Sequence, residues 1–147
     1  MADKKEALNI AEQKSVMSAI YELIKKYPKP KGLEVKFEEF KENGSSLAIF
    51  SDSGAYIDKK YITGAFTGIV PFSIVYRAAP NQDKHKINMI EFLENLAVWL
   101  NEEDYPDMTD SRTLLSIEAT TVAFKDMSNQ AGDNDYAILL NATYRKE

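Results

Sequence analysis

The second half of the chain constrains the fold most, because strand-like runs lie there on both sides of one amphipathic helix. Aromatic and β-branched residues crowd the runs at 61–66, 70–78, 113–124 and 135–145. An apolar stripe of helical period predicts a helix over about 83–102, with Asn81 or Asp83 as N-cap. Strand clusters separated by helices, with connections of hairpin length, predict an α+β domain with a mainly antiparallel sheet.

The first third of the chain adds one more helix and a pair of strands. Apolar residues at three- and four-residue steps predict a helix over 7–27, with Glu12 on its polar face. Alternation over 33–51 around Asn43-Gly44 predicts a β-hairpin. Residues 56–60 are expected to be an irregular lead-in to the next strand. We expect one domain over 1–147, with residues 1–6 as a disordered tail and both amphipathic helices packed on the sheet.

Composition limits the classes of function. A chain of 147 residues without cysteine has no disulfide framework, no thiolate zinc site and no cysteine nucleophile. The formal charge of −5 argues against general affinity for nucleic acid. No apolar run approaches the roughly 20 residues that span a bilayer, and the first residues are too polar for a signal peptide. We expect no membrane association and an intracellular site of synthesis.

Residues that carry catalytic chemistry are scarce. His85, the single histidine, lies between two lysines, where a solvated helix residue is expected. Carboxylates cluster around Asp107 and around Asp133, but neither cluster has the spacing of a calcium-binding helix-loop-helix. Gly64 and Gly68 lack the lysine and hydroxyl residue of a phosphate-binding loop. The sequence therefore predicts no enzyme activity, no metal and no cofactor.

Several segments together carry a resemblance to a known family. They are Tyr61-Ile-Thr-Gly64, Val70–Arg77, Ala97-Val-Trp-Leu100, the strand around Ser116-Ile-Glu118, and Asp135–Arg145. Over roughly residues 56–145 the chain resembles the tail-terminator, or tail-completion, proteins of long-tailed bacteriophages and prophages, a group that overlaps with small minor capsid proteins. The matching features are patterns of aromatic and apolar positions rather than a catalytic signature.

The resemblance implies a structural role in the neck of the virion. Such proteins form a six-subunit ring on the last ring of tail-tube subunits, stop tube polymerisation and present a docking surface to the head-connector or head-completion protein. DNA would pass through the lumen without specific binding, which suits an acidic chain. The resemblance thus implies self-association, assembly in the host cytoplasm and no chemistry.

Two segments expected to be loops, 52–60 and 125–134, are the candidate assembly interface, because loops tolerate variation and carry binding. Tyr56 and Met127 are the expected hot spots within them, and mobile solvated loops are the alternative. The candidate residues are Asp52, Tyr56, Ile57, Asp58, Lys59, Lys60, Lys125, Met127, Asn129, Asp133 and Asn134.

Two other functions are compatible with the sequence. One is a different neck role, such as head completion or head-tail joining, and the other is a small-molecule enzyme or binding domain.

Overall fold

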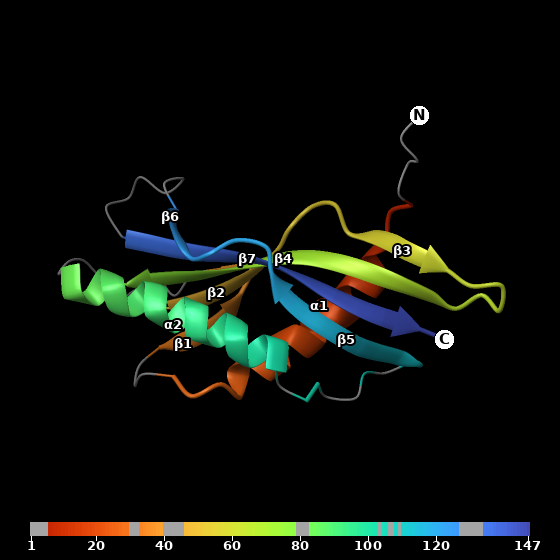
Figure 1. The fold of residues 1–147 in the computed structure, drawn as a ribbon, viewed down its shortest axis with the longest axis horizontal. Coiled ribbons are helices and arrows are strands. Elements are labelled where there is room, and N and C mark those ends of the chain that lie inside the picture. Colours follow the sequence, from red (N-terminus) through yellow and green to blue (C-terminus); the bar gives the residue numbers. More distant parts are fainter. Residues whose placement is uncertain are drawn as a thin grey trace.

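A computed structural model of the chain describes residues 6–29, 33–39, 46–78, 83–102, 104–105, 108, 110–126 and 134–147. Two helices and seven strands occur in this part of the chain (Figure 1). In chain order they are α1 (Ile10–Lys25), β1 (Glu34–Phe37), β2 (Ser46–Ser51), β3 (Tyr56–Lys60), β4 (Phe66–Ala78), α2 (Asp83–Glu102), β5 (Arg112–Ala119), β6 (Phe124–Asp126) and β7 (Asn134–Lys146).

Two long antiparallel strands, β4 and β7, form the centre of the sheet and pair along their whole length. β2 and β3 share the outer side of β4, one after the other, while β5 and β6 share the outer side of β7 in the same way. β1 then lies outside β2. The predicted α+β fold with a mainly antiparallel sheet is confirmed.

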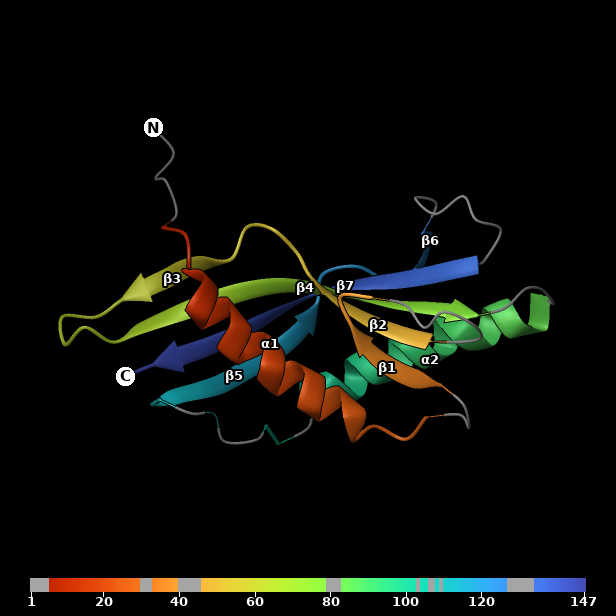
Figure 2. The same ribbon diagram turned by 180° about the vertical axis from the view of Figure 1, so that it is seen from behind.

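One face of the sheet carries the core and both helices. Phe72 lies opposite Leu140 and Ile74 opposite Ile138, and all four side chains are buried on this face. α2 packs on this face, where the ring of Phe92 lies 5.3 Å from that of Tyr76. The helices diverge because the sheet twists strongly along β4 and β7, so that α2 lies in front in Figure 1 and α1 in Figure 2.

The two helices meet through aromatic side chains at the C-terminal end of α1. The ring of Tyr27 lies 5.6 Å from that of Phe92 and 5.0 Å from that of Trp99. Trp99 is half-buried and packs against the core, which anchors α2 to the sheet. The bounds of α2 agree with the predicted helix over 83–102, whereas its predicted caps lie outside the described side chains.

The predicted hairpin over 33–51 is wrong. Both strands exist, but β1 pairs with β2 in parallel, with Val35 opposite Leu47 and Phe37 opposite Ile49. Residues 40–45, which hold the Asn-Gly pair, lie outside the described residues. After β1 the chain turns at Glu38, which has a φ of 61° and donates its N–H to the carbonyl of Ile49. A period-two pattern identifies a strand but carries no information on its direction.

The predicted strands at 61–66 and 70–78 are also redistributed. Residues 56–60, expected to be irregular, form β3, and residues 61–65 are the turn between β3 and the continuous strand β4. Pro71 is tolerated inside β4 because it lies where the neighbouring strand changes from β2 to β3. The carbonyl of Pro71 accepts a bond from the N–H of Asp52, which lies in the gap between those two strands. The missing N–H of Pro71 therefore faces this gap, where no strand needs it as a donor.

The predicted strand over 113–124 is interrupted in the structure. β5 ends at Ala119 and β6 begins at Phe124, and both pair with β7. Thr120 and Thr121 bridge the break, because the N–H of Thr120 donates to the carbonyl of Leu139 and the hydroxyl of Thr121 accepts from the N–H of Leu139. The last predicted strand, 135–145, agrees with β7 to within a residue at each end.

Candidate assembly surface

The hairpin formed by β3 and β4 projects at one end of the molecule (Figure 1). Its turn is closed by two backbone bonds, from Tyr61 N–H to the carbonyl of Ala65 at 2.9 Å and from Gly64 N–H to the carbonyl of Tyr61 at 3.0 Å. Gly64 has a φ of 95°, the left-handed conformation that glycine adopts without strain. The turn is therefore ordered by its own backbone.

The side chains of this turn are apolar and exposed. Ile62 is fully exposed and Tyr61 is 38% exposed. The guanidinium of Arg145 lies 4.6 Å from the centre of the Tyr61 ring, which holds the ring against β7. Ile62 thus lies at the tip next to Tyr61, whose ring is held in place by Arg145. We call Lys59, Lys60, Tyr61, Ile62 and Arg145 the hairpin tip.

The segment before α1 braces the base of the hairpin. The carbonyl of Glu6 accepts a bond from the N–H of Ile57 at 2.8 Å, and Leu8 N–H donates to the carbonyl of Ala55 at 3.1 Å. The Glu6 carboxylate forms an ion pair with Lys60. Glu6 was predicted to belong to a disordered tail, and that prediction is wrong for this residue. Residues 1–5 lie outside the described residues.

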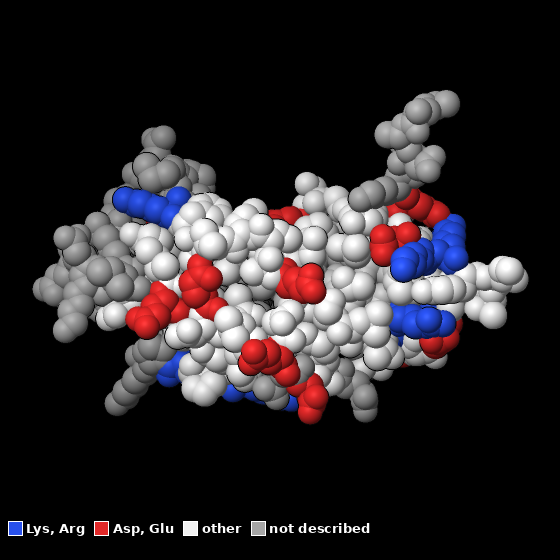
Figure 3. All heavy atoms as spheres, viewed as in Figure 1, with Lys and Arg blue, Asp and Glu red and all other residues white. Residues whose placement is uncertain are grey.

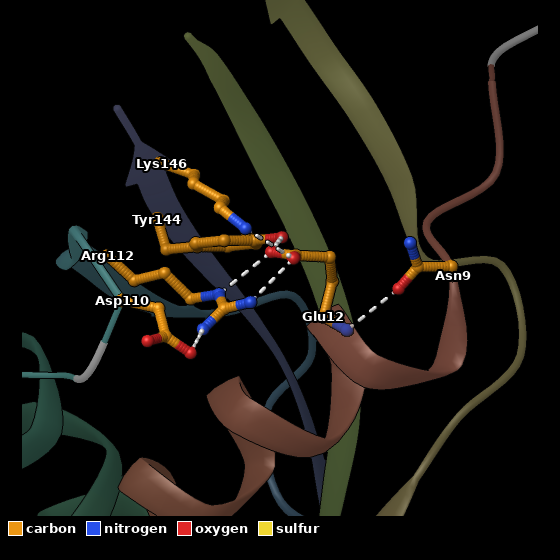
Figure 4. A network of polar contacts seen from close by, with 6 residues as sticks. All are labelled: Asn9, Glu12, Asp110, Arg112, Tyr144 and Lys146. Atoms are coloured by element: carbon orange, nitrogen blue, oxygen red, sulfur yellow. Dashed lines mark hydrogen bonds and ion pairs between the residues drawn. The ribbon is translucent and has the colours of Figure 1, made fainter.

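A buried polar network attaches α1 to the strands beneath the hairpin end (Figure 4). The Glu12 carboxylate accepts two bonds from the Arg112 guanidinium, at 2.9 and 2.7 Å. It also accepts from the Tyr144 hydroxyl at 2.9 Å and from the Lys146 ammonium at 3.2 Å. Glu12 is 6% exposed, so its predicted place on the polar face of the helix is wrong. The network joins α1 to β5 and β7.

The start of α1 explains why Glu12 occupies this position. Asn9 is the N-cap, and its side-chain oxygen accepts a bond from the N–H of Glu12 at 3.0 Å. This bond fixes the first turn, and the Glu12 side chain then extends from it toward β5 and β7 (Figure 4). The Arg112 guanidinium lowers the pKa of Glu12 from 4.5 to about 2, while burial and the Glu12 carboxylate raise the pKa of the Tyr144 hydroxyl.

This pKa predicts an acid-sensitive contribution to stability. The pKa of Glu12 is lower in the folded than in the unfolded chain, so its stabilising effect is complete above pH 4.5 and is lost as the pH falls toward 2. The shift corresponds to about 3 kcal/mol of unfolding free energy. Urea unfolding of the wild type and of Glu12→Gln across this range measures it. The difference in stability between them should shrink by about this amount, and a constant difference would contradict the assignment.

The candidate interface residues predicted from sequence fall into two groups that the structure keeps apart. Asp58, Lys59 and Lys60 are exposed on β3, whereas Lys125 is exposed on β6. β3 lies beside the stretch of β4 that pairs with residues 143–146 of β7, and β6 lies beside residues 135–137. Lys125 lies opposite Tyr136 and Lys59 is in register with Arg145, so the groups are nine residues, or roughly 30 Å, apart along β7. The described members of the two groups do not form one continuous site.

The role given to residues 52–60 as an exposed loop is wrong in part. Tyr56 and Ile57 are half-buried within β3, and Ile57 packs against the core. Asp52 accepts a bond from the Ser73 hydroxyl at 3.3 Å, and burial raises the pKa of its carboxyl group. Ile62 lies at the tip of the hairpin, whereas the sequence pattern predicts a strand over 61–66. Thr63-Gly64 is the sequence feature that indicates a turn at this position. Its apolar neighbours make the segment resemble the interior of a strand.

The second predicted segment lies mostly outside the described part of the chain. Met127, Asn129 and Asp133 are not described, and Asn134 is described only as the first residue of β7. Asp107 and the side chain of His85 are likewise outside the described residues. Among the carboxylates that are described, Asp110 pairs with Arg112 at 3.3 Å. The described residues contain no cluster of three or more residues of metal-ligating type.

A shallow groove of about 470 Å³ lies between α1 and the edge strand β1. Met17, Tyr21, Val35 and Phe37 give it an apolar floor, and Lys14, Lys36 and Glu39 lie among its lining residues. Phe37 is 41% exposed. The groove is a second exposed apolar surface, close to α1 rather than to the hairpin tip.

Two comparisons with known proteins find nothing that matches the chain. A scan against protein-family models finds no match, and a search of curated proteins finds no significant similarity. Neither of the two described helices is long and apolar enough to cross a membrane. The function is therefore inferred from the chain's own residues and from the resemblance of its sequence pattern.

Proposed function

We propose that the chain is a structural subunit of the neck of a long-tailed bacteriophage, a tail terminator that forms a ring on the end of the tail tube. In this role it stops tube polymerisation and offers a docking surface to the head connector. The observation that carries the proposal is the ordered hairpin with the fully exposed Ile62 at its tip. An isoleucine exposed to water on a hydrogen-bonded turn suits a side chain that is buried on assembly.

The shape of the subunit also supports a ring. A ring needs a heterologous interface, in which one patch on each copy meets a different patch on the next. The hairpin tip lies at one end of the longest axis, and α2 runs from the other end to about the middle (Figure 1). A projection at one end and an exposed helix well away from it suit contacts that repeat in one direction. The resemblance of the sequence to tail-terminator proteins also favours a ring-forming subunit.

Electron microscopy of particles from the parent phage or prophage with this gene disrupted tests the proposal. Overlong tail tubes without heads are the expected result, because nothing would stop the tube from growing. Tails of normal length beside full, unjoined heads would assign the chain to a head-tail joining role instead. Intact virions would remove it from the neck altogether.

A further inference from the structure

We propose that the hairpin tip of one copy docks on the exposed side of α2 of a second copy. The inference rests on the proposed ring and names the two surfaces that would form its subunit contact. On α2 the residues Glu91, Glu94, Val98 and Glu102 follow one another at steps of three, four and four. Residues at such steps share one side of a helix. We call these four residues the acidic stripe.

Val98 is the apolar member of the acidic stripe, and carboxylates lie on both sides of it. Val98 is 54% exposed. Glu94 and Glu102 are each four residues away from it along the helix, and Glu91 and Glu102 are exposed. Glu94 is half-buried, and one of its carboxylate oxygens accepts a bond from the N–H of Ala123. The stripe therefore offers an apolar centre between negative charges.

Charge complementarity selects the hairpin tip as the partner of the acidic stripe. In Figure 3 several acidic side chains lie over α2, while basic side chains flank the hairpin tip beside the carboxylates with which they pair. The tip contains three cations, Lys59, Lys60 and Arg145, around the apolar Ile62. An apolar centre among cations matches an apolar centre among carboxylates, and such matching favours one partner and orientation.

Existing ion pairs at the tip do not prevent this contact. Lys60 pairs with Glu6 and Arg145 with Glu147, at 2.6 Å for the latter, and both carboxylates are more than half exposed. Exposed pairs of this kind contribute little to stability. Their cations can therefore exchange these carboxylates for those of α2 at small cost. Asp58, two residues before Lys60, is the exposed carboxylate on β3 that would have to face away from the stripe.

The groove beside α1 is a poorer partner for the tip. Lys14 and Lys36 contribute two cations to its lining, against the single carboxylate of Glu39. Like charges facing one another across an interface oppose association. The groove also lies on the α1 side of the molecule, while the acidic stripe lies on α2, in front in Figure 1 and behind in Figure 2. We therefore assign the tip to the stripe, and docking in the groove becomes an outcome of the test.

Disulfide trapping between two single-cysteine variants tests the contact, since the chain has no cysteine of its own. Ile62→Cys is mixed with Val98→Cys and oxidised at high protein concentration. A disulfide requires Cα atoms within about 7 Å, so trapping reports direct contact. Leu115→Cys on β5 is the matched control for Val98→Cys, because the two positions are 48% and 54% exposed. Phe37→Cys tests the groove.

We expect the Ile62–Val98 product to form at least tenfold faster than the Ile62–Leu115 product and to slow at about 1 M salt, where charges are strongly screened. The double variant Ile62→Cys/Val98→Cys should give a ladder of linked chains. Equal rates with Leu115→Cys, or dominant products with Phe37→Cys or between two Ile62→Cys copies, would overturn the contact. Any of these results would leave the neck role to be decided by tail length in the gene disruption, so the two failures are separable.

Discussion

Replacing Arg112 with methionine should destabilise the chain by about 3–5 kcal/mol at pH 7. The Glu12 carboxylate is 6% exposed and receives two of its four bonds from Arg112. Removing one partner of a buried ion pair leaves a charge without adequate compensation in a region of low dielectric constant. The loss should exceed that of an average hydrogen bond several-fold. Urea unfolding at pH 7 measures the free energy directly.

Two further variants separate a buried charge from lost packing. Arg145→Met removes an arginine whose partner Glu147 is 62% exposed, and it should cost much less than Arg112→Met. The double variant Glu12→Gln/Arg112→Met has no buried charge in this network, and the glutamine oxygen can still accept a bond from the Tyr144 hydroxyl. It should be more stable than Arg112→Met alone. A double variant that is equally unstable or worse would contradict the explanation by an uncompensated carboxylate.

Replacing Gly68 with alanine should destabilise the chain by about 1–3 kcal/mol through overpacking. Gly68 lies opposite Tyr144, and a Cβ atom there would be 2.6 Å from the Tyr144 Cε1 atom and 3.1 Å from the Leu8 Cδ1 atom. Tyr144 cannot move away easily, because its side chain is fully buried and its hydroxyl is bonded to Glu12. Thermal unfolding of Gly68→Ala measures the effect.

A double-mutant cycle supplies the control for Gly68. Tyr144→Leu removes the ring atom that the new methyl group would strike, although the substitution is itself destabilising. The losses of Gly68→Ala and Tyr144→Leu should therefore add to more than the loss of the double variant, by at least about 1 kcal/mol. Strict additivity would mean that the close contact of the methyl group with the ring is not the cause.

The parts of the fold that sequence predicts well are those whose pattern is long and local. The bounds of α2 and β7 agree because each segment keeps one period over 20 and 13 residues. The direction of β1 and the continuity of β4 could not be predicted in this way. Gly68 and Pro71 resemble strand breaks, yet each is accommodated by a partner far away in sequence, the Tyr144 ring and the break between β2 and β3.

The candidate surface was predicted less well than the fold, for the same physical reason. Glu12 and Arg112 are separated by 100 residues, and nothing local distinguishes Glu12 from a solvated helix residue. Tyr56 looked like an exposed loop residue because its neighbours are charged, but pairing with β4 makes it half-buried. Lys59 and Lys60 were predicted as interface residues and lie in the hairpin tip, where their role remains a prediction.

Tail length in complemented particles tests the central claim most directly. The gene-disrupted phage is supplied with wild-type protein, with Ile62→Asp, or with Leu115→Asp as a control of similar chemistry at another exposed position. Ile62 is fully exposed in the subunit, so its replacement should leave folding intact, which thermal unfolding confirms. We predict normal tails with the wild type and with Leu115→Asp, and overlong tubes with Ile62→Asp. Normal tails with Ile62→Asp would contradict the account.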